Sequence, residues 1–395
     1  MGNWVKVKIS DIGEVVGGAT PSTKNEQYYN GDISWITPKD LSDFKGRFIS
    51  RGERNITQQG LESCSTRLLP KNTILFSSRA PIGYVAIAEK SMCTNQGFKS
   101  VIPNEKIDYM FLYYLLKYNK DRIEAMGSGT TFKEVSGSTM RNIEVEIPRS
   151  ITEQKKIANI LDAIDSKIEN NQKINANLLE QALTIYRNYF ASNKKLNKVK
   201  ISDVALNITD GVHNTVIDNP NGEYYLLSCK NIKGGALSIG SSERKIDKQT
   251  FDKLRRRTKL SKGDVLISSV GTIGELLLLN VEPLDYEFQR SVAIVKPNTE
   301  LISSEYLYLS LLTLKAELIN AAHGAVQQCL FISDIAEFQI IMPDYNDMIK
   351  FTEIVAPIFN TITSNENENI RLGALRNALL PKLMSGEIDL FSMDI

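Results

Sequence analysis

The hexapeptide KVKISD occurs at residues 6–11 and returns unchanged at residues 198–203. Further along, LPKNTILFSSRAPIG at 69–83 returns in looser form as LSKGDVLISSVGTIG at 260–274. The units of a solenoid are roughly 20–50 residues long, so a period of about half the chain indicates a duplicated domain instead. Because the matches keep their order, we predict two homologous domains that have diverged in sequence.

Two segments outside these matches carry heptad patterns. From Leu161 to Tyr189 nine positions are spaced alternately by three and four residues, and seven are apolar or aromatic. From Val355 to Leu383 the pattern recurs, again with seven apolar positions of nine. This spacing predicts two long helices with coiled-coil seams. In both seams asparagine occupies the same two positions, and these register residues are Asn171, Asn175, Asn365 and Asn369.

The asparagines also predict how the helices pair. In an antiparallel pair whose partner numbers sum to 540, Asn171 meets Asn369 and Asn175 meets Asn365. Amides at seam positions satisfy each other in this register, whereas a slip would leave them against apolar side chains. We therefore predict an antiparallel coiled coil. The alternative left open by the sequence is that each helix packs only on its own domain.

The same register makes predictions for other residues of the helices. Arg376 falls opposite Ile164, where its stem would pack and its head would reach water. Asp162 and Asp165 are expected on the outer, solvated face. Proline disrupts a helix interior, so Pro357 is expected to kink the second helix or mark its first turn. Pro381 is expected to end or bend it.

These patterns predict a mixed α+β fold, with two pseudo-repeated α/β domains joined by two long helices. Each repeat is expected to hold an amphipathic helix, at 109–118 and at 304–315. The expected boundaries are 1–150 for the first repeat, 151–193 for the central helix, 194–344 for the second repeat and 345–395 for the C-terminal helix.

Composition narrows the class of protein. The 395 residues carry a net charge of +1, with 42% hydrophobic and 24% charged residues, as in ordinary globular proteins. No apolar run approaches the roughly 18 residues of a membrane span, and residues 1–11 have no secretory apolar core. Four cysteines without a CxxC pair argue against a zinc ribbon or a disulfide framework. We expect a cytoplasmic protein with reduced thiols.

The sequence contains no recognisable catalytic motif. GxSxG, HExxH and a GxxxxGK[ST] phosphate loop are all missing, and the two histidines, His213 and His323, stand at unmatched positions. We therefore expect no catalytic residue, no metal site and no cofactor in this chain. The pattern favours a recognition protein or a scaffold.

Candidate recognition residues are polar or aromatic and cluster in the turns of both repeats, whose side chains differ while the apolar frame recurs. Arg, Lys, Asn and Gln read base edges, whereas Ser, Thr and Lys suit phosphates. A basic cluster at 244–262 has a solvated surface as its alternative explanation, and ordinary polar turns remain the alternative for the others. The candidates for DNA binding are Thr20, Ser22, Tyr28, Trp35, Lys39, Ser78, Arg79, Gln96, Thr130, Thr131, Lys133, His213, Asn214, Lys230, Asn231, Ser269, Gln289, Arg290, Gln327 and Gln328.

Four motifs together resemble a known family. EQKKIANILDAIDSKI at 153–168 and LRNALLPKLMSGEIDL at 375–390 look like conserved helices of the specificity subunit of type I restriction–modification enzymes. GGATPS at 17–22, followed by ISWITPKDL, and SSRAPIG at 77–83 are similar to landmarks of the family's target-recognition domains. The resemblance covers essentially the whole chain.

The resemblance implies a non-catalytic subunit that binds double-stranded DNA. Each domain would read one half of a bipartite, asymmetric site, while the helical pair would set the spacing and dock two methyltransferase (modification) subunits. Two restriction (translocase) subunits would complete the complex, and S-adenosylmethionine, ATP and magnesium would belong to the partners. The second domain lacks the Thr-Pro-Ser of the first, having His213-Asn214-Thr215, and has Val270 for Arg79, which implies a different half-site.

Two functions of other classes remain as alternatives. One is a coiled-coil scaffold whose two domains bind proteins. The other is a stand-alone DNA-binding protein or nuclease. Turnover of DNA by the pure chain would favour the enzyme, and absence of DNA protection would favour the scaffold.

Overall fold

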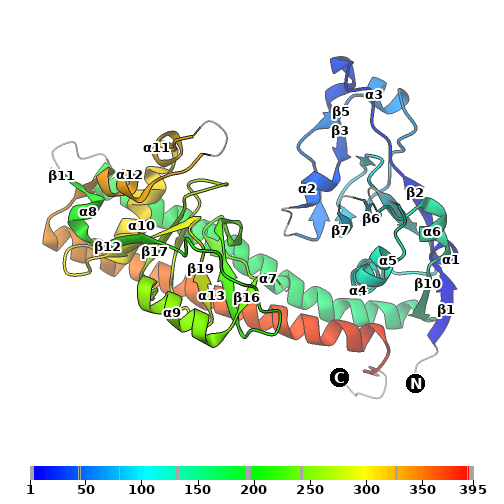
Figure 1. Cartoon of the computed structure of the whole chain (residues 1–395). Helices are drawn as coiled ribbons and strands as arrows, with labels where there is room; N and C mark the ends of the chain where they lie inside the picture. Colours follow the sequence, from blue (N-terminus) through cyan, green and yellow to red (C-terminus); the bar gives the residue numbers. More distant parts are fainter. Residues whose placement is uncertain are drawn as a thin grey trace. The chain divides into compact units, whose positions relative to one another are not determined.

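Contacts within the chain divide it into two units. The computed structural model describes residues 4–42, 44, 46–79, 81–129, 133–191, 197–240, 243–324, 328–388 and 390. Unit 1 consists of Met1–Asn170 with Glu368–Ile395, and unit 2 of Asn171–Asn367. Each unit therefore holds one repeat together with half of each long helix, α7 (Ile151–Tyr186) and α13 (Tyr345–Met384) (Figure 1).

Unit 1 is built on a five-stranded sheet, in which helix α4 (Tyr109–Tyr118) packs on β6 and β7. The strand order is β2 (Gly13–Gly17), β9 (Lys99–Pro103), β6 (Ile74–Ser78), β7 (Ile82–Ala88) and β4 (Phe48–Ile49). A three-stranded sheet has the order β5 (Asn55–Ile56), β3 (Tyr29–Ile36) and β8 (Cys93–Thr94), and β1 (Trp4–Lys8) pairs with β10 (Glu144–Pro148). The shorter helices are α1 (Ile9–Ile12), η1 (Glu26–Tyr28), α2 (Pro38–Ser42), α3 (Gln58–Glu62), α5 (Lys120–Ala125) and α6 (Gly137–Asn142).

Unit 2 repeats this plan, with α10 (Ser304–Thr313) in the place of α4. The main sheet has the order β12 (Ala205–Asp210), β20 (Val292–Pro297), β17 (Val265–Ser268) and β18 (Leu276–Leu278). The smaller sheets are β16 (Lys245–Ile246), β13 (Tyr224–Leu227) and β19 (Tyr286–Phe288), then β11 (Asn197–Lys200) with β21 (Gln339–Met342), and β14 (Ile232–Lys233) with β15 (Ala236–Leu237). The shorter helices are α8 (Ile201–Val204), η3 (Cys229–Asn231), α9 (Lys248–Thr258), α11 (Lys315–Asn320) and α12 (Ile332–Glu337).

The sheets confirm the predicted duplication, although unit 1 adds β4 to its main sheet and unit 2 adds the pair β14–β15. In unit 1, β3 pairs antiparallel with β5 and parallel with β8; in unit 2, β13 pairs antiparallel with β16 and parallel with β19. A parallel pair next to an antiparallel one is specific enough to exclude a chance likeness. The predicted mixed α+β class with two repeated domains and two long helices is therefore confirmed.

The repeated hexapeptide KVKISD ends a strand and begins a helical turn. In the first copy the Asp11 carboxylate accepts from the backbone N–H of Lys8 at 2.8 Å, and in the second Asp203 accepts from Lys200 at 3.0 Å. In the first copy Lys8 is followed by Ile9, which is fully buried. The aspartate satisfies a donor at the start of the turn, which explains why the same letters serve both units.

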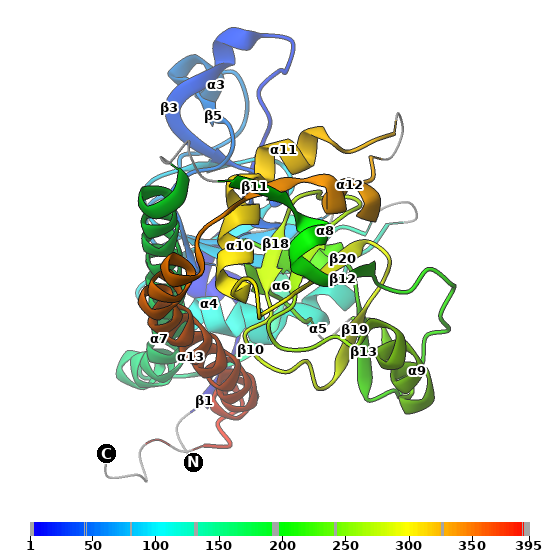
Figure 2. The same cartoon turned by 90° about the vertical axis from the view of Figure 1, so that its left-hand side faces the viewer.

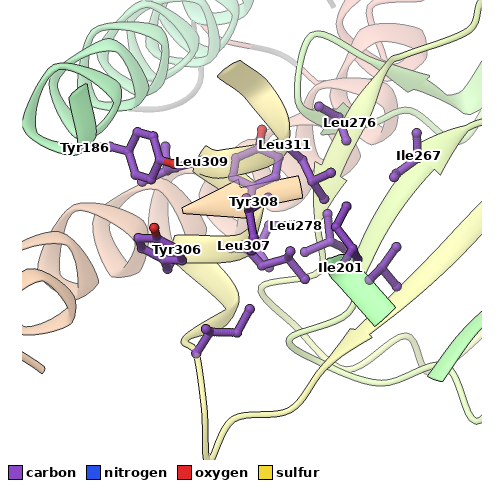
Figure 3. Close-up of a cluster of buried hydrophobic side chains, with 14 of the residues drawn as sticks. Tyr186, Ile201, Ile267, Leu276, Leu278, Tyr306, Leu307, Tyr308, Leu309 and Leu311 are labelled. Atoms are coloured by element: carbon purple, nitrogen blue, oxygen red, sulfur yellow. The ribbon is translucent and has the colours of Figure 1, made fainter. Parts of the chain in front are cut away.

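The helices α4 and α10 are buried more completely than the predicted amphipathic pattern requires. In α4 the seven residues from 110 to 116 are all buried, because the sheet covers one side and α7 packs on another. In unit 2, Figure 3 shows α10 side chains between the sheet and the long helices, with Tyr186 of α7 near Tyr306. These two rings lie 5.4 Å apart between centroids. A helix that lies between a sheet and other helices is buried on both sides, so its sequence is apolar all round and not only on one face.

The long helices pair antiparallel, as predicted. In unit 2 the Asn365 Nδ2 donates to Asn175 Oδ1 at 2.7 Å, so this asparagine pair forms in the predicted register. In unit 1 Lys167 lies 3.2 Å from Glu368, which matches the same antiparallel direction. Figure 2 shows α7 and α13 side by side in unit 2. The alternative in which the helices never meet is therefore wrong.

The seam prediction for Tyr189 is wrong, and one of the two alternatives predicted for each proline of α13 is excluded. Tyr189 was expected in the seam but is 43% exposed, whereas Tyr186 and Phe190 are buried. A straight helix drifts relative to a heptad, and the chain leaves α7 through a π-helical turn, Arg187–Ala191. Pro357 does not mark a first turn and Pro381 does not end the helix, because α13 begins at Tyr345 and continues to Met384. A kink at Pro357 and a bend at Pro381 remain predictions.

Of the two aspartates expected on the solvated face of α7, Asp165 is buried and Asp162 is only 36% exposed, which corrects a further prediction. Asp165 is only 5% exposed; it accepts from the Tyr114 hydroxyl at 2.9 Å and from Arg376 Nη1 at 2.7 Å. The Arg376 head therefore binds a buried carboxylate and remains only partly exposed to water. Asp162 pairs with the buried Arg47. Both contacts tie unit 1 to its part of the helical pair.

The described residues contain no helix that is both long enough and apolar enough to cross a membrane.

Candidate nucleic-acid interface

In unit 1 the turn at 17–22 is held against the loop after β8. The Ala19 N–H donates to the Thr94 carbonyl at 3.1 Å. A Cβ on Gly18 would lie 2.2 Å from the carbonyl oxygens of Thr94 and Asn95, so only glycine allows this approach. The approach brings the Thr20 hydroxyl into a hydrogen bond with the Gln96 side chain. Two predicted recognition residues therefore meet at one edge of the unit.

Two buried aromatic rings support this turn from below. Trp35 Nε1 donates to the Ala19 carbonyl at 3.1 Å, and the Tyr29 hydroxyl donates to the Pro21 carbonyl at 2.6 Å. Arg54 lies over the Tyr29 ring at 4.2 Å. Since Trp35 is only 4% exposed, it fixes the turn and does not present a surface. Burial also raises the pKa of the neighbouring Cys93 thiol to about 11, so this thiol stays protonated.

Unit 2 builds the same junction with different side chains. A Cβ on Gly211 would lie 2.2 Å from the Phe288 and Gln289 carbonyl oxygens. The Val212 N–H donates to Phe288 at 2.9 Å, and the Arg290 N–H donates back to Val212 at 3.0 Å. These bonds place the turn that carries His213 next to Gln289 and Arg290.

His213 itself is held by a carboxylate. Its Nε2 lies 2.5 Å from Asp210 Oδ2, while the imidazole remains exposed. Asp210 also contacts Arg257 of α9, whose Nη2 donates to the Asp210 carbonyl at 2.6 Å. Arg257 was not among the predicted site residues. Its signal in the sequence was only the basic run at 255–257, which does not reveal a partner 47 positions away.

Most other predicted residues lie at the surface, and several cations among them have partners. Lys39 lies 2.7 Å from Glu53, Arg79 lies 3.7 Å from Glu134, and Lys230 lies 3.0 Å from Glu243. The pair of Lys39 with Glu53 is exposed on both sides and therefore weak, so phosphate could replace this carboxylate, whereas Glu243 is only 10% exposed. The remaining surface residues are Ser22, Lys133, Asn214 and Gln328, which are exposed, and Tyr28, which is half-buried.

Three further predicted residues are buried and support loops. The hydroxyl of Ser78 donates to the Gly97 carbonyl at 3.2 Å, and that of Ser269 donates to the Arg290 carbonyl at 3.3 Å. Asn231 accepts from the Ser228 N–H at 2.9 Å and donates to the Ser238 carbonyl at 2.9 Å. Like Trp35, these buried side chains stabilise the loops and are not available to contact DNA. The sequence suggested otherwise because a polar residue in a turn can either contact a ligand or support the turn.

Three predicted residues, Thr130, Thr131 and Gln327, lie outside the described residues. Within the described ranges, no group of three or more His, Cys, Asp or Glu side chains is arranged to hold a metal ion.

Comparison with known proteins gives a consistent picture. The family model described as the type I restriction modification DNA specificity domain matches twice, over residues 1–180 and 193–373. The two matches coincide with the two copies of the repeat, and together they span most of the chain.

Individual relatives carry related names. The MjaIX specificity subunit of a type I restriction enzyme from Methanocaldococcus jannaschii is 35% identical over 98% of this chain and 94% of its own length. The EcoR124I/EcoR124II specificity subunit from Escherichia coli is 31% identical over 40% of each chain. A crystal structure of the S subunit of a type I system from M. genitalium has a TM-score of 0.57 at 17% identity, covering 97% of this chain and 96% of its own. That last likeness supports the fold.

Proposed function

The chain belongs to the family of type I restriction–modification DNA specificity subunits, and from this premise we propose that each repeated domain reads one half of a bipartite DNA site. As a specificity subunit, it is the DNA sequence-recognition component and is not itself an enzyme. Methylation and restriction in this family lie in other subunits.

One observation supports the proposal that the two domains recognise different half-sites. The glycine junctions at Gly18 and Gly211 have the same backbone geometry, with the same 2.2 Å approach to the loop that follows β8 or β19. The side chains at the two junctions differ: Thr20 with Gln96 in unit 1, and His213 with Gln289 and Arg290 in unit 2. The two units thus share the backbone geometry of the junction and differ in its polar side chains. This is what we expect of two domains that contact DNA in the same way but recognise different bases.

The interface proposed for DNA comprises the exposed and half-buried candidates of these turns. In unit 1 the described candidates are Thr20, Ser22, Tyr28, Lys39, Arg79, Gln96 and Lys133. In unit 2 they are His213, Asn214, Lys230, Gln289, Arg290 and Gln328. Thr130, Thr131 and Gln327, outside the described residues, remain candidates from the sequence alone. Arg, Gln and Asn members would contact base edges, and Lys, Ser and Thr members would contact phosphates.

The partners follow from the same premise. We propose that the helical pair docks two methyltransferase subunits, and that two restriction subunits complete the enzyme. S-adenosylmethionine, ATP and magnesium would then be bound by those partners and not by this chain.

The long helices are proposed to set the gap between the half-sites. With 36 and 40 residues, α7 and α13 are about 54 and 60 Å long at 1.5 Å per residue. Inserting one heptad in both helices would add about 10 Å, which corresponds to roughly three base pairs at 3.4 Å each. An unchanged gap in the methylated site after such an insertion would exclude this spacer role.

The proposed function is tested by mapping methylated bases. The chain is expressed with its modification partner in a host that lacks other methylation, and genomic DNA is sequenced with base-modification detection. We expect one asymmetric motif with two specified parts and an unspecified gap. Methylation without sequence preference, or at a single uninterrupted motif, would contradict the proposal.

A further inference from the structure

Helix α9 of unit 2 carries a basic surface that no site described so far uses. One side of the helix is apolar: Phe251 and Leu254 pack against β13 and β16, and the Phe251 ring stacks on Tyr224 at 4.1 Å. The helix is capped by Asp247, which accepts from the Thr250 N–H at 2.7 Å, and ends at Lys259 in the left-handed conformation. The opposite side of this fixed helix faces solvent.

The five cations of α9 and the lysine at its C-terminal cap fall into two groups. Three have carboxylate partners: Arg255 pairs with the fully buried Glu287, Lys248 lies 3.3 Å from Asp252, and Arg257 lies 3.7 Å from Asp210.

The other three cations are Lys253, Arg256 and Lys259, which we call the basic face. All three are exposed, and among the described residues none forms an ion pair with a carboxylate. Arg256 Nε donates only to the Asp252 carbonyl, at 3.2 Å. Lys253 and Arg256 are three residues apart and therefore lie on the same side of α9, and Lys259 follows at its C-terminal cap. The basic face thus concentrates positive charge that no carboxylate of the described residues neutralises.

The basic face is fixed next to the recognition turn of the same unit. Arg257 holds the Asp210 carbonyl at 2.6 Å, and Asp210 holds His213 at 2.5 Å. Val212, in the same turn, packs against the Phe251 and Leu254 cluster under the helix. The helix and the turn therefore form one rigid surface, with the polar turn next to the cations.

Unit 1 has no equivalent of this face among its described residues. Its corresponding helix, α3, has five residues and contains no lysine or arginine. The next cation along the chain, Arg67, is paired with Glu14 at 2.5 Å, unlike the three cations of the basic face.

We propose that the basic face binds the phosphate backbone of DNA beside the half-site read by the second domain. This inference rests on the proposed function and adds an asymmetry to it. Lysine and arginine groups without local partners are suited to phosphate oxygens and release counterions on binding. The second domain thus supplies a sequence-independent phosphate contact from α9 that the corresponding helix α3 of the first domain does not offer, while Arg257 acts as a positioning residue for the turn.

The test is the salt dependence of DNA binding by the chain assembled with its modification subunits. A variant with Lys253→Gln, Arg256→Gln and Lys259→Gln is titrated with a labelled mixed-sequence duplex at several salt concentrations. The charge-matched control has Lys71→Gln, Lys90→Gln and Lys106→Gln, three exposed lysines at the ends of β6, β7 and β9 away from Arg79.

Each lost phosphate contact lowers the slope of log K against log salt by about 0.9. The basic-face variant should therefore lose about 2.7 of slope, and the control less than about 1. The methylated motif should stay unchanged in both, because phosphate contacts carry no base identity.

Three results would overturn the inference. Equal slopes in the two variants would exclude a phosphate contact, and a changed motif would make these residues base readers. Loss of modification-subunit binding with an unchanged slope would assign the face to an acidic protein partner. A different outcome would contradict the proposed function itself. In that case the complex of the unaltered chain and the complex of the control variant would both fail to bind DNA. Failure of the basic-face inference alone would leave DNA binding by both of these complexes intact.

Discussion

The buried contact of Asp165 with Tyr114 and Arg376 makes the sharpest stability prediction. The Asp165→Asn change keeps an oxygen that accepts from the Tyr114 hydroxyl but removes the charge opposite Arg376 Nη1, 2.7 Å away. Hydrogen bonds to charged groups contribute about 1.5–3 kcal/mol, and breaking a buried ion pair costs about 3–5 kcal/mol. Because the Arg376 side chain is 27% exposed, water recovers part of its solvation. We expect a loss of about 2–3 kcal/mol in unit 1.

Hydrogen exchange of the full chain measures this loss locally. Amides of α4 and of the C-terminal turns of α13 should exchange about 30–150-fold faster, at tenfold for each 1.4 kcal/mol. Amides of α10, in unit 2, provide an internal reference. Arg376→Gln and the double variant with Asp165→Asn complete a double-mutant cycle. We expect this cycle to give a coupling free energy of about 1–2 kcal/mol between the two residues.

The matched control lies two positions along the same helix. Lys167 lies 3.2 Å from Glu368, but the two side chains are 51% and 43% exposed. Exposed pairs contribute little, so Lys167→Gln should change the free energy by less than about 0.5 kcal/mol. Equal exchange rates in Asp165→Asn and Lys167→Gln would refute the claim that burial makes the first contact strong.

Three other predictions concern unit 2. Burial raises the pKa of Glu366 to about 7, so the stability that its neutral form provides is full below its ordinary value of 4.5 and is lost as pH rises through about 7. Glu366→Gln should therefore stabilise the chain by about 1–3 kcal/mol at about pH 8 and have little effect at about pH 5, as measured by urea unfolding; equal gains at both values would contradict this. Asn175→Leu should lower the free energy of unfolding by about 1–2 kcal/mol, because it leaves the Asn365 amide unpaired. Adding Asn365→Leu should recover most of this loss. If the losses of the two single variants simply added in the double variant, the asparagine pair would be excluded. Arg255→Met should cost about 3–5 kcal/mol because Glu287 is fully buried, and Glu287→Gln should rescue it in thermal unfolding; no rescue would mean that Arg255 acts only through packing.

The sequence predicted those parts of the structure that follow from periodicity. The asparagine spacing gave the register in which Asn365 meets Asn175, because polar residues tolerate few positions in an apolar seam. The duplicated motifs gave the two domains, since letters shared in order imply a shared fold.

The sequence could not predict contacts that arise only in three dimensions. Asp165 appeared solvated because its partner Tyr114 lies 51 residues away on another helix. Ser78 and Asn231 appeared to be readers because a turn shows polarity without showing direction, and their partners are backbone carbonyls. Arg257 was missed because its role depends on Asp210, which only the packing of α9 brings within reach.

Exchange of one domain tests the central claim most directly. Residues 1–150 are replaced by the equivalent segment of a relative with a known, different site, and methylated bases are mapped in cells that also express the modification partner. We expect one half of the motif to change to that of the donor, while the other half and the gap length stay the same. A motif that changes in both halves, or in neither, would contradict the claim that each domain reads its own half-site.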